Sequence, residues 1–156
     1  MDKKKKLLII AHAPSDNTQK MFQAVISGAS NQEIENVDVQ ALIPLETQPE
    51  DINSADAIIL GTTENLGYMA GLVKDLFDRC YYNCIDKTEG LPFAFYIRAG
   101  HDGTGTCRAI KSISKGLSWK LVQDPLICRG KFQEEFIDQC EELGLAMAAS
   151  LESGII

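Results

Sequence analysis

Short apolar runs alternate along this chain with longer segments in which apolar residues recur every three or four positions. Short runs of this kind are typical of strands, and the longer spacing is typical of amphipathic helices. The predicted strands are 5–12, 37–43, 55–61, 91–100 and 120–130. The predicted helices are 18–31, 69–85, 104–117 and 132–151. We expect a loop where Pro44 and Pro49 lie, and an interruption of the fifth strand near Asp124 and Pro125.

Strands that alternate with helices predict one α/β domain over residues 1–156, built on a five-stranded, doubly wound parallel sheet. The expected strand order is 2-1-3-4-5, with helices on both faces. The run 55–61 is apolar throughout, as in a strand covered on both faces, whereas 37–43 alternates, as in an edge strand. Ligands of such sheets bind at the carboxyl ends of the strands, near the switch point. Function should therefore be sought in the connections after the first, third and fourth strands.

Charge and composition exclude several classes of protein. The 22 acidic and 15 basic side chains give a formal net charge of −7, which argues against a nucleic-acid-binding protein. The cluster Lys3–Lys6 precedes only four strongly apolar residues, too few for a signal peptide or a membrane anchor. No apolar run approaches the roughly 20 residues of a membrane span. We therefore expect a cytoplasmic protein with neither a nucleic-acid nor a membrane partner.

The cysteines and histidines offer little for disulfides or metals. Five cysteines, an odd number, argue against a disulfide framework. Cys80 and Cys84 lie four apart on a predicted helix, but the chain has only two histidines to complete a metal site. We expect buried thiols and no metal. Cys107, near the start of a predicted helix, is either packed or a reactive thiol.

The connection after the first strand reads "HAPSDNT" over residues 12–18. One interpretation is a turn whose polar residues cap the following helix. The other is an anion cradle. The segment lacks the Gly-x-x-x-x-Gly-Lys pattern of nucleoside triphosphate sites and contains no Lys or Arg. Free N–H groups of a helix N-terminus, with Ser15, Asn17 and Thr18, suit a phosphate monoester, and Asp16 is expected to point away from it.

The two other connections are also rich in small and polar residues. The stretch "GTTENLGYMAG" (61–71) is long for a connection from strand to helix and has Gly67 where a left-handed backbone is needed. Its polar and aromatic side chains suit a flat heterocycle. The stretch "RAGHDGTG" (98–105) carries three glycines, which let backbone N–H groups approach a ligand. Convergence of all three connections at one sheet edge indicates a ligand site.

The segments "SDNTQKM", "GTTENLGYMAGLVKDLFDRC" and "RAGHDGTG" resemble the flavodoxin-like superfamily, especially its NAD(P)H-dependent FMN reductase and quinone reductase branch. The second segment is the most specific, although Thr63 stands where the quinone reductases have Pro and Glu64 where they have Thr. His12, Ala13 and Pro14 depart from the Ser/Thr-rich start of true flavodoxins. The resemblance covers nearly the whole chain and implies a flavodoxin-like three-layer sandwich that binds FMN.

The same resemblance implies which residues contact FMN. Ser15, Asn17 and Thr18 would hold the phosphate, so the cap and the cradle are one structure. The two walls around the isoalloxazine ring would comprise Thr62, Thr63, Glu64, Asn65, Leu66, Gly67 and Tyr68, and Ala99, Gly100, His101, Asp102 and Gly103. His12 has either a flavin contact or a structural role in the turn. We assign no catalytic residue, because a flavin itself carries the redox chemistry.

Three functions follow from the resemblance. The first is an NAD(P)H-dependent oxidoreductase that reduces flavin, a quinone or a similar acceptor. It is favoured because Leu66 and His101 stand where flavodoxins would place stacking aromatic rings. The second is a flavodoxin-type electron carrier with a redox protein as partner, which the acidic composition fits. The third is a non-catalytic FMN-binding module. A response-regulator receiver is excluded because His12 and Gly61 stand where it needs acidic residues, and a low-molecular-weight phosphatase because the first connection has no cysteine.

Assembly is the last expectation. Related reductases are commonly oligomers, and this chain has no separate domain to cover an exposed flavin face. We expect a homodimer with Tyr81 or Tyr82 in the contact, the alternative being that these tyrosines pack internally.

Overall fold

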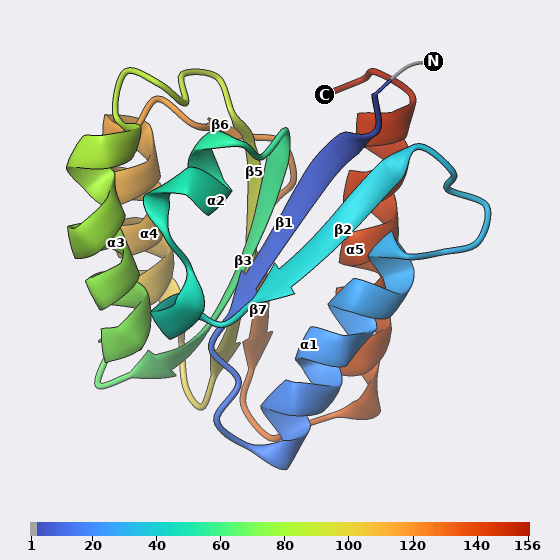
Figure 1. Ribbon diagram of the computed structural model, residues 1–156. Helices are drawn as coiled ribbons and strands as arrows, with labels where there is room; N and C mark the ends of the chain where they lie inside the picture. The colour runs from blue at the N-terminus through green and yellow to red at the C-terminus, as the bar shows by residue number, and fades with distance from the viewer. Residues whose placement is uncertain (1–2) are drawn as a thin grey trace.

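A central parallel sheet carries helices on both faces in the computed structural model, which describes residues 3–156 (Figure 1). Helices α1 and α5 cover one face, and α2, α3 and α4 lie on the other (Figure 1). The strands are β1 (Lys5–Ala11), β2 (Val37–Leu42), β3 (Ala57–Asn65), β4 (Tyr68–Met69), β5 (Pro92–Ala99), β6 (Lys120–Leu121) and β7 (Leu126–Arg129). The helices are α1 (Asp16–Ala29), the 3-10 helix η1 (Pro44–Glu46), α2 (Pro49–Asn53), α3 (Gly71–Cys84), α4 (Thr104–Gly116) and α5 (Glu134–Glu152).

The strand order confirms the predicted fold class. The sheet runs β2-β1-β3-β5-β6, and β7 also pairs with β5 in parallel. β6 and β7 are the two halves of the predicted fifth strand, separated at 122–125, where the interruption was expected. Counting the two halves as one strand, the parallel strands lie in the order 2-1-3-4-5. The short strand β4 is an addition that pairs antiparallel with the end of β3.

Burial on both faces explains the apolar runs of β1 and β3. Leu7 and Ile9 pack in the core beneath α1 and α5, and Leu8 and Ile10 pack in the core beneath α3 and α4. All four side chains are at most 1% exposed. Such complete burial on two faces is the environment that a continuous apolar strand requires.

Helices α1 and α5 approach each other at two glycines. A Cβ on Gly28 would lie 1.9 Å from the carbonyl oxygen of Glu141, and one on Gly144 would lie 2.1 Å from that of Val25. The two helices are therefore in backbone contact, which no residue with a side chain allows at these positions.

The connection between β2 and β3 corrects one prediction. Expected as a loop, it contains η1 and α2, each with proline at its first position. Proline there is compatible with a helix, because the first N–H has no intrahelical partner. The expected ends of other elements shift by a few residues, and β3 runs four residues beyond its predicted end at Gly61.

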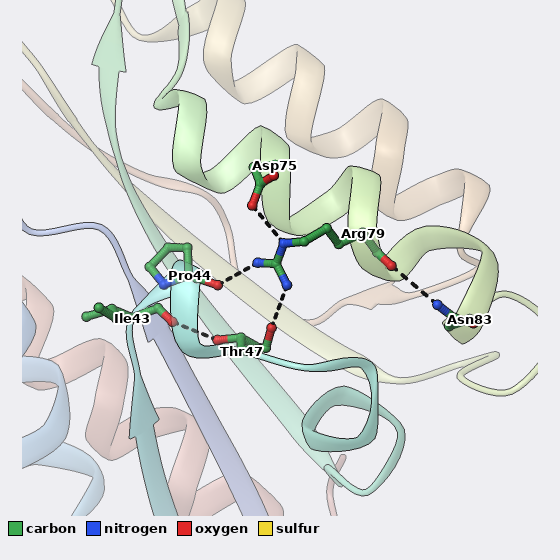
Figure 2. A network of polar contacts seen from close by, with 6 residues as sticks. All are labelled: Ile43, Pro44, Thr47, Asp75, Arg79 and Asn83. Carbon is green, nitrogen blue, oxygen red and sulfur yellow. Dashed lines mark hydrogen bonds and ion pairs between the residues drawn. The ribbon is translucent and has the colours of Figure 1, made fainter.

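Arg79 of α3 fixes this connection to the rest of the domain (Figure 2). Its Nη1 donates to the carbonyl oxygen of Thr47 at 2.9 Å, and its Nη2 donates to that of Pro44 at 2.8 Å. Its Nε donates to Asp75 at 2.7 Å. The hydroxyl of buried Thr47 donates to the carbonyl oxygen of Ile43. One guanidinium thus supplies the donor that the carbonyl oxygen of Thr47 needs and a second donor to that of Pro44, which also accepts from the N–H of Thr47.

Within residues 3–156, no helix is long and apolar enough to cross a membrane, and no three His, Cys, Asp or Glu side chains lie close enough together to hold a metal ion. All the cysteines are free thiols; Cys107 is half-buried and the other four are buried.

Candidate functional site

The three connections singled out in the sequence meet at the carboxyl edge of the sheet, at the bottom of Figure 1. The backbone N–H of His12 donates to the carbonyl oxygen of Gly61 at 3.0 Å, which joins the first connection to the second. The second touches the third, because a Cβ on Gly105 would lie 2.6 Å from the carbonyl oxygen of Gly67. Their convergence is therefore a property of the fold.

The first connection ends in a reciprocal cap of α1. The backbone N–H of Thr18 donates to Ser15 Oγ at 3.2 Å, and the backbone N–H of Ser15 donates to Thr18 Oγ1 at 2.9 Å. The capping interpretation is therefore confirmed. Among the described residues, the N–H groups of Asp16 and Asn17 have no acceptor, and both residues are exposed. The helix N-terminus thus retains two free donors and the positive end of its dipole.

His12 stands half-buried at the end of β1. Burial lowers the pKa of its imidazole below the usual value of 6.5. The side chain is therefore neutral at pH 7, and it offers this edge of the sheet a hydrogen-bonding group rather than a positive charge.

The second connection is a β-hairpin, where a loop was expected. β3 extends to Asn65, and β4 returns antiparallel to it, with Glu64 opposite Met69. Thr62 closes its base: the hydroxyl accepts from the N–H of Ala70 at 3.1 Å and donates to the carbonyl oxygen of Thr63 at 2.9 Å. Because Thr62 is only 1% exposed, its side chain is committed to this structure.

The tip of the hairpin is strained and apolar. Leu66 and Gly67 have φ values of 54° and 76°, as the two central residues of a type I′ turn require. Glycine adopts this conformation freely, but in leucine it costs about 1 kcal/mol. The Leu66 side chain is fully exposed, at 105% of its reference area. A strained residue that presents a large apolar side chain to solvent indicates a contact surface.

The third connection lies against the hairpin through the start of α4. Thr106 Oγ1 donates to Glu64 Oε2 at 3.5 Å, a weak contact between the two walls. Gly103 is the N-cap residue of α4 and has a φ of 75°, and a Cβ there would lie 2.6 Å from Ile127 Cγ2. Asp102 is held by neighbours: its carboxylate accepts from the hydroxyl of Thr104, and its carbonyl oxygen accepts from Arg129 Nε at 2.5 Å.

The residues predicted to bind the cofactor differ in what they expose. Thr18, Thr62, Ala99 and Gly103 are buried, so Thr62 and Ala99 offer this edge only their backbones. His12, Thr63 and Glu64 are half-buried. The exposed members are Ser15, Asn17, Asn65, Leu66, Gly67, Tyr68, Gly100, His101 and Asp102.

Two residues at this edge were not singled out from the sequence. Tyr96 is 4% exposed, its ring occupies the space where Gly61 lacks a side chain, and burial raises the pKa of its hydroxyl. Arg98 Nη1 donates to the carbonyl oxygens of Ala99 and Cys128. Its guanidinium also lies over two phenylalanine rings at 5.3 and 5.8 Å from their centres. The one sequence feature that could have indicated the position of Tyr96 is Gly61, a glycine at the end of an apolar strand.

Comparison with known proteins identifies the fold. No protein-family model and no curated protein sequence matches the chain. Among solved structures, a flavodoxin from the domain Archaea has a TM-score of 0.78 and 21% identity, over 94% of this chain and 98% of its own. Flavodoxin 1 from Bacillus cereus has a TM-score of 0.73 and 18% identity, over 90% and 95%. A WrbA-like flavodoxin from Agrobacterium tumefaciens has a TM-score of 0.68 and 13% identity, over 94% and 96%. The chain therefore has the flavodoxin-like fold.

Proposed function

We propose that this protein is an FMN-binding redox flavoprotein. The observation that carries the proposal is the N-terminus of α1, whose free N–H groups of Asp16 and Asn17 lie at the carboxyl edge of a flavodoxin-like sheet. Two further connections reach the same edge and supply candidate walls for a flat ring. Similar solved structures are flavodoxins, which supports the same function by analogy of fold.

The donor set at α1 fits a phosphate monoester. A dianion accepts hydrogen bonds from backbone N–H groups and gains from the helix dipole without a counter-ion. The exposed hydroxyl of Ser15 and the exposed amide of Asn17 add donors beside the two free N–H groups. FMN, when bound, would supply the electron-accepting ring, and the residues of this chain would bind and orient it. Leu66 and Tyr68 on one wall and His101 on the other are exposed and available to the ring.

Replacing Asp16 with proline tests the cradle directly. Residue 16 is the first residue of α1, where proline is tolerated, and Ser15 before it is extended (φ −132°, ψ 166°), as a residue before proline must be. Asp16→Pro removes one of the two free N–H groups and should weaken FMN binding about tenfold, since a hydrogen bond to a charged group contributes roughly 1.5 kcal/mol or more. Riboflavin, which lacks the phosphate, should bind equally well to both proteins.

Asp16→Ala is the matched control, because it removes the same carboxylate and keeps the N–H. It should bind FMN at least as tightly as the parent protein. Flavin fluorescence titration measures the binding of both flavins to all three proteins. Absence of saturable FMN binding at micromolar protein would refute the proposed function itself.

For the reaction, we propose an NAD(P)H-dependent oxidoreductase acting on a small-molecule acceptor such as a quinone or flavin. The favouring observation is that Tyr68 is the one large aromatic side chain exposed on the two walls, whereas Leu66 and His101, which are also exposed, are not large stacking aromatics. They leave room for a nicotinamide and an acceptor in turn. Stopped-flow mixing with NADH and NADPH is the test. If neither reduces bound FMN faster than free FMN, the protein is instead an electron carrier. If the bound FMN exchanges electrons with no donor, the protein is a non-catalytic FMN-binding module.

For assembly, we propose a homodimer that contacts through α3. Tyr81 and Tyr82 pack edge to face at 5.2 Å, but they differ in exposure. The hydroxyl of Tyr81 fills the space over Gly116 of α4, whereas Tyr82 is 84% exposed. Tyr82 is thus the residue available to a partner copy. Light scattering should show a dimer for the parent protein and a monomer for Tyr82→Ser; a parent protein that is monomeric at all concentrations would contradict the proposal.

A further inference from the structure

A second site candidate lies at the opposite edge of the sheet, where β1 begins. A cavity of about 550 Å³ is lined there by Lys3, Lys4, Lys5, Lys6, Asp38, Val39, Gln40, Ser54 and Asp56. This volume is within the range of small-molecule sites. Its position, at the amino ends of the strands, separates it from the candidate flavin site at their carboxyl ends.

The cavity exists because the crossover from β2 to β3 contains only short helices, η1 of three residues and α2 of five. Among the described residues, no helix lies in front of the upper parts of β1 and β2 in Figure 1, whereas α5 passes behind β2. The strand positions that face this space are polar. In the strand register Lys6 lies beside Asp38, and Leu8 lies beside Gln40. Of these four residues only Leu8 is fully buried.

The lining is positively charged in a protein whose net charge is −7. Its lysines outnumber its two carboxylates, and one of these, Asp56, accepts the backbone N–H of Lys6 at 2.7 Å. The ammonium of Lys6 contacts Ser54 Oγ at 3.1 Å and, within residues 3–156, has no carboxylate partner. Lys4 reaches Asp38 only at 3.8 Å, with both side chains more than half exposed. These two ammonium groups are available to an anion.

Gln40 carries the second, independent observation. Its side-chain oxygen Oε1 is buried without a hydrogen-bond partner, the one side-chain atom in this state among the described residues. Leaving such a group unpaired costs about 1–3 kcal/mol. Solvent exposure would account for polar lysines on an open sheet face, but not for a buried unpaired amide oxygen. The terminal torsion of glutamine is soft, so the amide can turn to meet a donor in the cavity.

We infer that this cavity binds a small phosphorylated molecule that also carries hydroxyl groups, such as a sugar phosphate. The phosphate accepts from the ammonium groups of Lys4 and Lys6, and a hydroxyl of the same molecule donates to Gln40 Oε1. The ligand must carry both groups because the lining offers two ammonium donors, those of Lys4 and Lys6, and one unpaired acceptor, Gln40 Oε1. This site is independent of the proposed flavin site, which lies at the other end of the sheet.

Titration of the ¹⁵N-labelled full chain with ribose 5-phosphate tests the inference. Backbone amides of Lys6, Gln40 and Asp56 should shift saturably, and unphosphorylated ribose should shift none of them. Inorganic phosphate and sulfate, which carry no sugar hydroxyl, should both shift them with weaker affinity. Shifts confined to Asp16 and Asn17 would place phosphate at α1 instead and overturn the inference, as would equal affinities for ribose 5-phosphate and sulfate or no saturation up to about 10 mM.

Three variants separate the contributions of the lining. Lys4→Gln combined with Lys6→Gln should reduce ribose 5-phosphate affinity at least about tenfold, whereas Lys111→Gln, an exposed lysine on α4, should leave it unchanged. Gln40→Leu should reduce ribose 5-phosphate affinity and leave inorganic phosphate affinity unchanged, which a merely structural role of Gln40 would not produce. The dispersed spectrum of each variant reports that it is folded, and a folded Gln40→Leu protein with parental affinities would overturn the assignment.

Discussion

Replacing Gly144 with alanine has two opposite effects on stability, one from helix propensity and one from the contact between α1 and α5. On helix propensity alone, alanine in the interior of α5 should stabilise the protein by about 1 kcal/mol. In the structure, however, its Cβ would lie 2.1 Å from the carbonyl oxygen of Val25 and 3.0 Å from the N–H nitrogen of Ala29. Both obstacles are backbone atoms of α1, so no side chain can turn aside to make room.

The magnitude follows from how far the helices must separate. Relieving a contact that is more than 1 Å too short requires α5 to move away from α1 along a buried interface that includes Met21, Val25 and Met147. Overpacking of a core costs about 1–3 kcal/mol and sometimes more, and an obstacle made of backbone belongs at the upper end. After the propensity gain, we expect Gly144→Ala to lower the free energy of unfolding by about 2 kcal/mol, or roughly 4–8 °C in Tm for a domain of this size.

Urea denaturation followed by circular dichroism measures this change. Gly71→Ala is the control, because Gly71 begins α3 and a Cβ there meets nothing within 4 Å. The control should be neutral or slightly stabilised. A Gly144→Ala protein as stable as the parent, or more stable, would refute the backbone contact between the two helices.

Three further predictions rest on other residues. Arg79→Met should lower the free energy of unfolding by about 2–3 kcal/mol in the same assay, because two carbonyl groups lose charged donors, while the partly exposed pair with Asp75 adds little; an unchanged urea midpoint would contradict it. Leu66→Asn should raise stability by a few tenths of a kcal/mol to about 1 kcal/mol by relieving the positive φ, and should weaken FMN binding in fluorescence titration; unchanged affinity would exclude Leu66 from the ring wall. His12 has a pKa below its unfolded value of 6.5, so the unfolded chain takes up the proton first and stability falls as pH drops below about 6.5. His12→Gln should therefore lose less stability than the parent protein between pH 7.5 and pH 5.5, and equal losses would show that this burial has no energetic effect.

The sequence by itself determined the order of elements and the edge of the sheet that carries the candidate flavin site. Leu7 to Ile10 and Ala57 to Leu60 are apolar at every position, and only a strand buried on both faces accommodates that pattern. Parallel strands joined by helices then bring the connections after β1, β3 and β5 to one edge whatever the side chains are. Ser15 and Thr18 also bond to each other within one turn of helix, so the local sequence was enough to predict this cap.

Only the tertiary structure decided features whose partners lie far along the chain or whose local signal is weak. Leu66 has no preference for a type I′ turn, so the hairpin at the tip of β3 was read as a loop. Gly144 looks like a poor helix residue until α1, more than a hundred residues earlier, is placed against it. The cavity beside Gln40 depends on α2 being too short to cover β1 and β2. The physical reason is common to all three: a residue's spacing reports its own periodicity, whereas steric contact and an unpaired polar atom are defined only by what the fold places next to it.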